Sequence, residues 1–158
     1  MAKFSTPLGV IAERVELRID GVYKRTAKRL FHDIVNRTPV KDPLENEVTG
    51  TAANSWRAYI NSPNKTGAMP ADPSASGAHD SIDSIVEGFR TRSGDSVGLE
   101  NGCSYIGMLD HGLYRNPSRA KNPKTVGGFS TQAPHGIVLI SLMRFRQFVK
   151  EARSEYGS

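Results

Sequence analysis

Hydrophobic residues recur at three- and four-residue steps through the first part of the chain, which is the spacing of one face of an α-helix. The pattern predicts one amphipathic helix over residues 8–37, with apolar positions Leu8, Ile11, Val15, Ile19, Val22, Ala27, Leu30 and Ile34. Pro39 ends it, because the residue before a proline is disfavoured in the α region. Gly21 interrupts the pattern and indicates a bend or a close crossing of another element. These 30 residues span about 45 Å, so we expect part of the helix to lie against a partner.

The middle of the chain changes to strand-like alternation. Residues 55–61 place Trp56, Ala58 and Ile60 on one side, which predicts a half-buried strand. Two more strands are predicted at 96–100 and 104–110, joined by an Asn-Gly dipeptide that strongly favours a tight hairpin turn. A short helix is predicted between these strands by four closely spaced apolar residues, Ile82, Ile85, Val86 and Phe89.

The most apolar stretch lies near the C-terminus. Pro134 is tolerated in a first helical turn, and the apolar residues that follow recur at steps of four, three and four. We predict a helix over 134–153 that packs on the sheet; the β-branched segment 136–140 leaves a strand as the alternative. The predicted core residues of the chain are Trp56, Tyr105, Leu109, Val138, Leu142 and Phe145.

Three stretches read as loops. Residues 41–49 are acidic and aperiodic, 62–80 are rich in Pro and Ser, and 112–132 are polar and cationic. The last two are predicted to be flexible, because they hold too few large apolar residues to pack alone. The whole pattern predicts a single α+β domain over 1–158, in which a long N-terminal helix and a C-terminal helix pack on a small antiparallel sheet.

Composition limits the class of protein. A chain of 158 residues buries enough surface for an ordinary core. Its one cysteine excludes an intramolecular disulfide and suits a reducing compartment, and no secretion signal is apparent. The longest apolar run, Ile137 to Met143, is seven residues, against the roughly 20 that a membrane-spanning helix needs. We therefore expect no membrane segment.

The net charge of +5 is unevenly distributed. Residues 7–37 carry seven Lys/Arg against four Asp/Glu, residues 38–102 five against nine, and residues 103–158 eight against three. Opposite charge blocks on one small domain suit contact with a differently charged surface, including that of another copy of the chain. A mixed solvated surface explains the same pattern equally well.

Few residues are candidates for chemistry. Adjacent His/Asp pairs occur at His32–Asp33, His79–Asp80 and Asp110–His111. Neighbouring side chains diverge on a helix and point to opposite faces of a strand, so we predict no metal site and no cofactor. Cys103 and His111 are a conceivable nucleophile and base, but no predicted helix N-terminus lies near Cys103 to stabilise a thiolate. We expect no enzyme activity, and a small hydrolase is the third hypothesis.

Two groups of cations are candidate interface or DNA-facing residues. The first lies on the long helix and the second in the loop 112–132: Lys24, Arg25, Lys28 and Arg29, then Arg115, Arg119, Lys121 and Lys124. Such cations neutralise phosphates and give salt-dependent DNA binding. No aromatic residues interleave with them and no helix-turn-helix or zinc motif is present, so we expect no sequence-specific recognition. A solvated face is the simplest interpretation of the helix group; contact with DNA or with an acidic protein is the alternative.

Four fragments carry a family resemblance. They are "RTPV" (Arg37–Val40), "TGTAANSWR" (Thr49–Arg57), "NGCSYIGMLDHG" (Asn101–Gly112) and "STQAPHGIV" (Ser130–Val138). Their order and spacing resemble the tail-completion, or head–tail joining, proteins in the neck of long-tailed bacteriophages. The chain departs from that pattern at three places: the inserted residues 41–48, Asp110-His111 in place of Glu and an aromatic, and Ile137 in place of Met.

The resemblance implies a structural virion protein. Its members are α+β protomers that form a ring, usually a hexamer, between the tail terminator and the head-side connector, with DNA passing through the lumen. We therefore expect self-association, location in the virion neck after assembly in the host cytoplasm, and no sequence recognition of DNA. The alternative is a stand-alone, non-specific DNA-binding accessory protein.

Overall fold

The computed structural model describes residues 8–42, 47–91, 94–112, 125–126 and 129–156. The helices are α1 (Leu8–Arg37), α2 (Thr51–Asn54), α3 (Ser76–Gly88), α4 (Ile106–His111), α5 (Val138–Met143) and α6 (Phe145–Tyr156). The strands are β1 (Lys41–Asp42), β2 (Glu47–Val48), β3 (Trp56–Ile60), β4 (Val97–Asn101), β5 (Thr125–Val126) and β6 (Phe129–Ser130). They form three two-stranded antiparallel pairs, β1–β2, β3–β4 and β5–β6. The predicted α+β class is confirmed.

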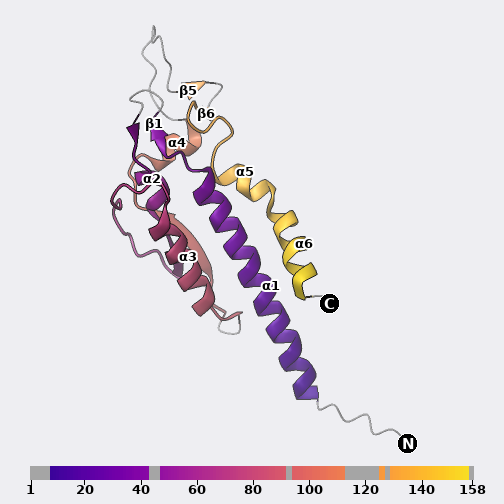
Figure 1. The fold of residues 1–158 in the computed structure, drawn as a ribbon. Coiled ribbons are helices and arrows are strands. Elements are labelled where there is room, and N and C mark those ends of the chain that lie inside the picture. The colour runs from indigo at the N-terminus through magenta and orange to yellow at the C-terminus, as the bar shows by residue number, and fades with distance from the viewer. Residues whose placement is uncertain (1–7, 43–46, 92–93, 113–124, 127–128, 157–158) are drawn as a thin grey trace, which may run out of the picture.

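The long helix α1 is the axis of the molecule (Figure 1). Its C-terminal half is covered by α3 and the β3–β4 pair on one side and by α5 and α6 on the other. Ala27, Phe31, Ile34 and Val35 are buried there. The N-terminal half extends past these elements, so the predicted helix is confirmed but only part of its apolar stripe is covered within the chain.

The β3–β4 pair confirms two predicted strands. It runs in register from Trp56 opposite Asn101 to Ile60 opposite Val97. Trp56 and Ala58 point into the core, as their alternation predicts. The helix α3 packs on β3, and it begins at Ser76, so the predicted loop 62–80 is too long at its C-terminal end.

The predicted hairpin at Asn101-Gly102 is wrong. The side chain of Asn101 donates to the carbonyl of Ala52 and accepts from the backbone N–H of Cys103, at 2.8 Å in each case. The N–H of Gly102 donates to Ser55. These bonds tie the turn to the residues before β3, so the chain does not fold back on β4. The helix α4 replaces most of the predicted strand 104–110.

Two predicted loops contain short strands. Residues 41–49, expected to be irregular, hold the paired strands β1 and β2. Within 112–132, β5 pairs with β6, and most of the rest lies outside the described residues. The segment 62–75 has no helix or strand but is hydrogen-bonded: Glu100 accepts from the N–H groups of Asn64 and Lys65.

The C-terminal helix is divided in two. It begins at Val138, not at residue 134, and is interrupted at Arg144 between α5 and α6. The strand alternative for 136–140 is wrong. The main neighbour of α6 is α1 rather than the sheet, and the ring of Tyr156 lies against Gly21, which is the close crossing that this glycine predicts. Among the described residues, no helix is both long and apolar enough to cross a bilayer.

Candidate interaction surface

Three of the four fragments that carry the family resemblance are joined by hydrogen bonds to one another. The indole N–H of Trp56 donates to the hydroxyl of Thr38 at 2.8 Å, and that hydroxyl donates to the carbonyl of Ile34 at 2.9 Å. Trp56 and Thr38 are both buried. This pair ties the end of α1 to the start of β3, while the Asn101 bonds tie β4 to α2.

The fourth fragment is held by a carboxylate. Asp110 accepts from the backbone N–H groups of Ile137 at 2.5 Å and Val138 at 3.0 Å, so it satisfies donors at the start of α5. Gly136 lies beside Asp110 with φ +74°, a conformation that glycine adopts most readily. The fragments therefore connect the end of α1, the β3–β4 pair and the start of α5.

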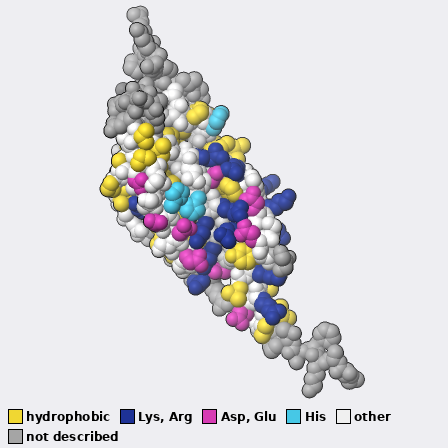
Figure 2. Space-filling view, viewed as in Figure 1, with side chains coloured by type: hydrophobic (Ala, Val, Ile, Leu, Met, Phe, Trp, Pro, Cys, Tyr) yellow, Lys and Arg dark blue, Asp and Glu magenta, His cyan; other side chains and the backbone are white. Residues whose placement is uncertain are grey.

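The cations predicted on the long helix are paired within the chain. Nζ of Lys24 lies 3.2 Å from the carboxylate of Asp20, and Nε of Arg25 lies 2.8 Å from that of Glu155. Nζ of Lys28 lies 3.3 Å from the carboxylate of Asp83 and 3.2 Å from that of Glu87. Arg29 pairs with Glu151 and Glu155 of α6. Figure 2 shows Lys/Arg and Asp/Glu side chains intermingled on this face.

These pairs connect α1 to α3 and α6. Lys24 is buried and also donates to the carbonyl of Glu87 at 2.8 Å. The hydrogen bond and the charge of Lys28 lower the pKa of Glu87. Burial raises the pKa of Asp20, but hydrogen bonds from Thr91 and Lys24 outweigh burial and lower it. The four cations are therefore not an uncompensated positive surface. The second predicted group, Arg115, Arg119, Lys121 and Lys124, lies outside the described residues.

The candidate chemical groups do not form a nucleophile–base pair. The thiol of Cys103 is buried and lies 3.3 Å from the hydroxyl of Ser55 and 3.7 Å from the carbonyl of Thr51. His111 is exposed and lies 3.6 Å from Asp110. Within the described part of the chain, no group of three or more His, Cys, Asp or Glu side chains is arranged to hold a metal ion.

Two histidines that the sequence does not connect meet between α1 and α3. Nδ1 of His32 lies 2.6 Å from Nδ1 of His79. Nε2 of His32 lies 3.3 Å from the carboxylate of Asp83, one turn along α3 from His79. Burial and the neighbouring His32 lower the pKa of His79. The pair joins α1 to α3.

Large apolar side chains are exposed along α1 and around α5 and α6. On α1 they are Val10, Ile11, Val15, Leu17 and Ile19, and around α5 and α6 they are Leu139, Leu142, Met143 and Phe145. The core prediction is therefore wrong for two residues, Leu142 and Phe145, which are 48% and 43% exposed. Trp56 and Leu109 are buried, whereas Tyr105 and Val138 are partly buried against the core.

The two exposed regions meet in an apolar groove between α1 and α6. Its volume is about 370 Å³, and its apolar walls are formed by Ile19, Val22, Tyr23, Phe145 and Val149. Arg18 and Arg153 are also among the residues that line it. Periodicity predicts the apolar stripe on α1, but it does not predict that α6 covers only part of this stripe. The signal available in the sequence is the length of the helix, which exceeds what so small a domain covers.

The chain matches no protein-family model, no curated protein and no solved structure. The resemblance of the four fragments to phage neck proteins stays a prediction, and functional inference rests on the surfaces described above.

Proposed function

We propose that this protein is a structural, non-enzymatic component of the neck of a long-tailed phage particle. Copies of the chain form a ring that completes the tail and joins it to the head, between the tail terminator and the head-side connector. DNA passes through the lumen without sequence recognition. The proposal rests on the family resemblance together with the exposed apolar surface of the chain.

The observation that carries the proposal is the uncovered half of α1. Five large apolar side chains between Val10 and Ile19 face solvent in the isolated chain. Several large apolar side chains exposed on one helix are typical of a site of protein–protein contact. A helix that extends beyond its own domain suits a protein whose task is to hold other subunits.

The charge distribution supports protein partners over DNA. The α1 cations that were candidate DNA contacts, Lys24, Arg25, Lys28 and Arg29, pair with carboxylates of α1, α3 and α6. Binding to phosphates would require these pairs to open. A stand-alone DNA-binding protein is therefore the less favoured alternative.

The test is a phage genome that lacks this gene. We expect filled heads and finished tails that stay unattached, with infectious particles restored when the chain is supplied in trans. Electron microscopy of the lysate counts the joined and separate structures. Normal infectious particles from the deletion would contradict the proposal.

A further inference from the structure

The free half of α1 has two apolar faces rather than one. Ile11 and Val15 continue the stripe that forms one wall of the groove between α1 and α6. Val10 and Leu17 are seven residues apart and therefore share a second face, roughly 140° away around the helix at about 100° per residue. Leu17 is 62% exposed. One face belongs to the groove of the same chain, and the second face is left without a partner among the described residues.

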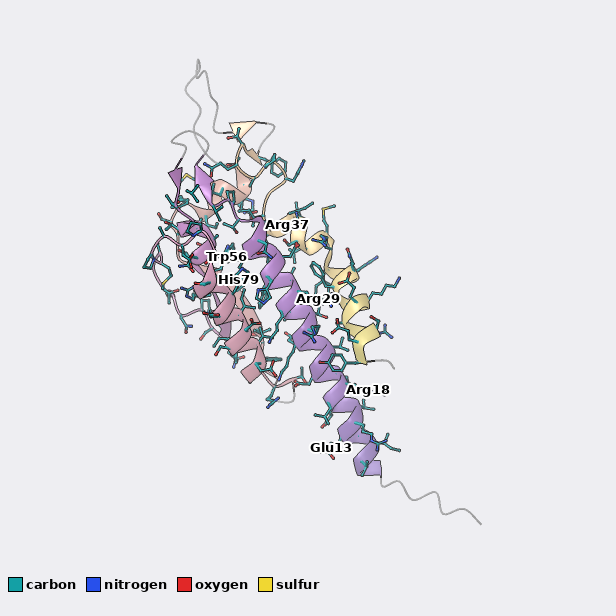
Figure 3. The ribbon with its side chains drawn as sticks, in the orientation of Figure 1. Glu13, Arg18, Arg29, Arg37, Trp56 and His79 are labelled. Atoms are coloured by element: carbon teal, nitrogen blue, oxygen red, sulfur yellow. The ribbon has the colours of Figure 1, made fainter. Side chains whose placement is uncertain are left out.

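The charges at the two surfaces are complementary. Arg18 and Arg153, which line the groove, form no ion pair with any described carboxylate, although most other described cations of α1 are paired. Glu13 lies on the second face of α1, three residues after Val10 and four before Leu17. Figure 3 shows Glu13 and Arg18 on the projecting part of α1. The apolar side chains of the second face match the apolar walls of the groove, and the carboxylate of Glu13 is opposite in charge to Arg18 and Arg153.

We propose that the second face of α1 in one copy of the chain docks in the α1–α6 groove of another copy. Leu17 and Val10 then contact Phe145 and Val149, and Glu13 approaches Arg153. The inference deepens the proposed function, on which it rests, by naming the surfaces that hold adjacent copies together.

This docking is head-to-tail, because the donor face and the groove are different surfaces of the chain. Each copy places the second face of its α1 in the groove of one neighbour and binds the α1 of another neighbour in its own groove. Contacts of this type close into a ring when the rotation between copies divides a full turn, and otherwise produce a filament. A two-fold dimer in which the free helix halves pair with each other is the competing arrangement.

Cysteine cross-linking distinguishes the two arrangements. Leu17→Cys places a thiol on the second face of α1, and Val149→Cys places one in the groove. The two variants are made in chains of different mass, so that a mixed dimer can be recognised. The native Cys103 is buried, so the unaltered chain is the blank. After mild oxidation we expect a disulfide-linked dimer with one chain of each kind from the mixture, and little dimer from either variant alone. The matched control replaces Val149→Cys by Ser154→Cys, whose thiol lies on α6 outside the groove residues.

A charge exchange gives a second measurement. Glu13→Arg in the Leu17→Cys chain is expected to lower the yield of the mixed dimer, and Arg153→Glu in the Val149→Cys chain is expected to restore it. Circular dichroism checks that each variant is folded.

Three results overturn the docking. The first is a yield of mixed dimer no higher than the yield with Ser154→Cys in place of Val149→Cys. The second is an abundant disulfide-linked dimer of Leu17→Cys with itself. The third is a yield of mixed dimer that Arg153→Glu does not restore in the presence of Glu13→Arg. The deletion experiment is independent of these measurements. If cross-linking fails but the deletion leaves heads and tails unattached, this interface is rejected and the proposed function is kept. If cross-linking succeeds but the deletion gives normal particles, the interface is kept and the proposed function is rejected.

Discussion

His32 of α1 and His79 of α3 face each other through their Nδ1 atoms, 2.6 Å apart, with ring centroids separated by 4.8 Å. One proton fits between two ring nitrogens at this distance, so one histidine donates and the other accepts. Asp83 lies beside Nε2 of His32 and favours a proton there. In a neutral ring, a proton on Nε2 leaves Nδ1 of His32 as the acceptor, so the Nδ1–H of His79 donates. Burial and the neighbouring His32 lower the pKa of His79, so its ring stays neutral to lower pH.

Acid is expected to weaken the contact between α1 and α3 through His79. Its pKa is lowered on folding from the value of 6.5, so its contribution to stability is present above about pH 6.5 and is lost as the pH falls through the lowered pKa. Urea unfolding at about pH 7.5 and about pH 5 measures the loss. We expect His79→Gln to lose less stability than the unaltered chain between these values. His135→Gln, at an exposed position, is the control, and an equal loss in all three proteins would reject the role of His79.

The second prediction concerns the bond between Trp56 and Thr38. Thr38→Val keeps the shape of the side chain but leaves the buried indole N–H without its acceptor. An unsatisfied buried donor costs about 1–3 kcal/mol, and we expect a loss of that size in the free energy of unfolding. Thr38→Ser keeps the hydroxyl and is expected to lose less. Equal losses in the two variants would show that packing, not the hydrogen bond, explains the position.

The third prediction concerns the loop that crosses Gly102. A Cβ at Gly102 would collide with the backbone carbonyls of Thr66 and Gly67. Gly102→Ala is therefore expected to displace the segment 62–75 and to make it susceptible to protease. The matched control is Gly107→Ala in α4, where a Cβ meets nothing within 4 Å. Protection of the loop in Gly102→Ala equal to that in the control would contradict the packing.

The fourth prediction separates ion pairing from DNA binding. Arg29 pairs with two carboxylates of α6, so Arg29→Ala is expected to lower stability by about 0.2–1 kcal/mol and to leave DNA affinity unchanged. Fluorescence anisotropy with a short duplex between about 50 and 200 mM salt measures that affinity. Arg146→Ala, at an exposed position of α6, is the control. A fall in affinity only in Arg29→Ala would favour the DNA-binding alternative.

Sequence periodicity predicts the elements that local spacing determines. The helix α1 and the strand β3 are confirmed because the apolar positions of each follow a single period. The helix α4 is missed because Asn101 bonds to residues that are distant in sequence, and a turn dipeptide carries no information about them.

The candidate surfaces show the same limit. Periodicity predicts which face of α1 is apolar, but not which part of that face the chain covers. The sequence alone predicts a positively charged patch on α1, because the carboxylates of α3 and α6 that pair with its cations are distant in sequence. His32 and His79 are 47 residues apart, and nothing between them predicts their contact.

The contact of Tyr156 with Gly21 sets the length of the free arm of α1. A Cβ at Gly21 would come within 2.6 Å of the tyrosine ring, so the end of α6 packs on α1 at a position that has no side chain. The residues before Gly21 then reach roughly 20 Å ahead of α6. Moving the glycine by one turn would change that reach by about 5 Å. In the proposed assembly, this one small residue would therefore set how far the helix of one copy extends toward the next.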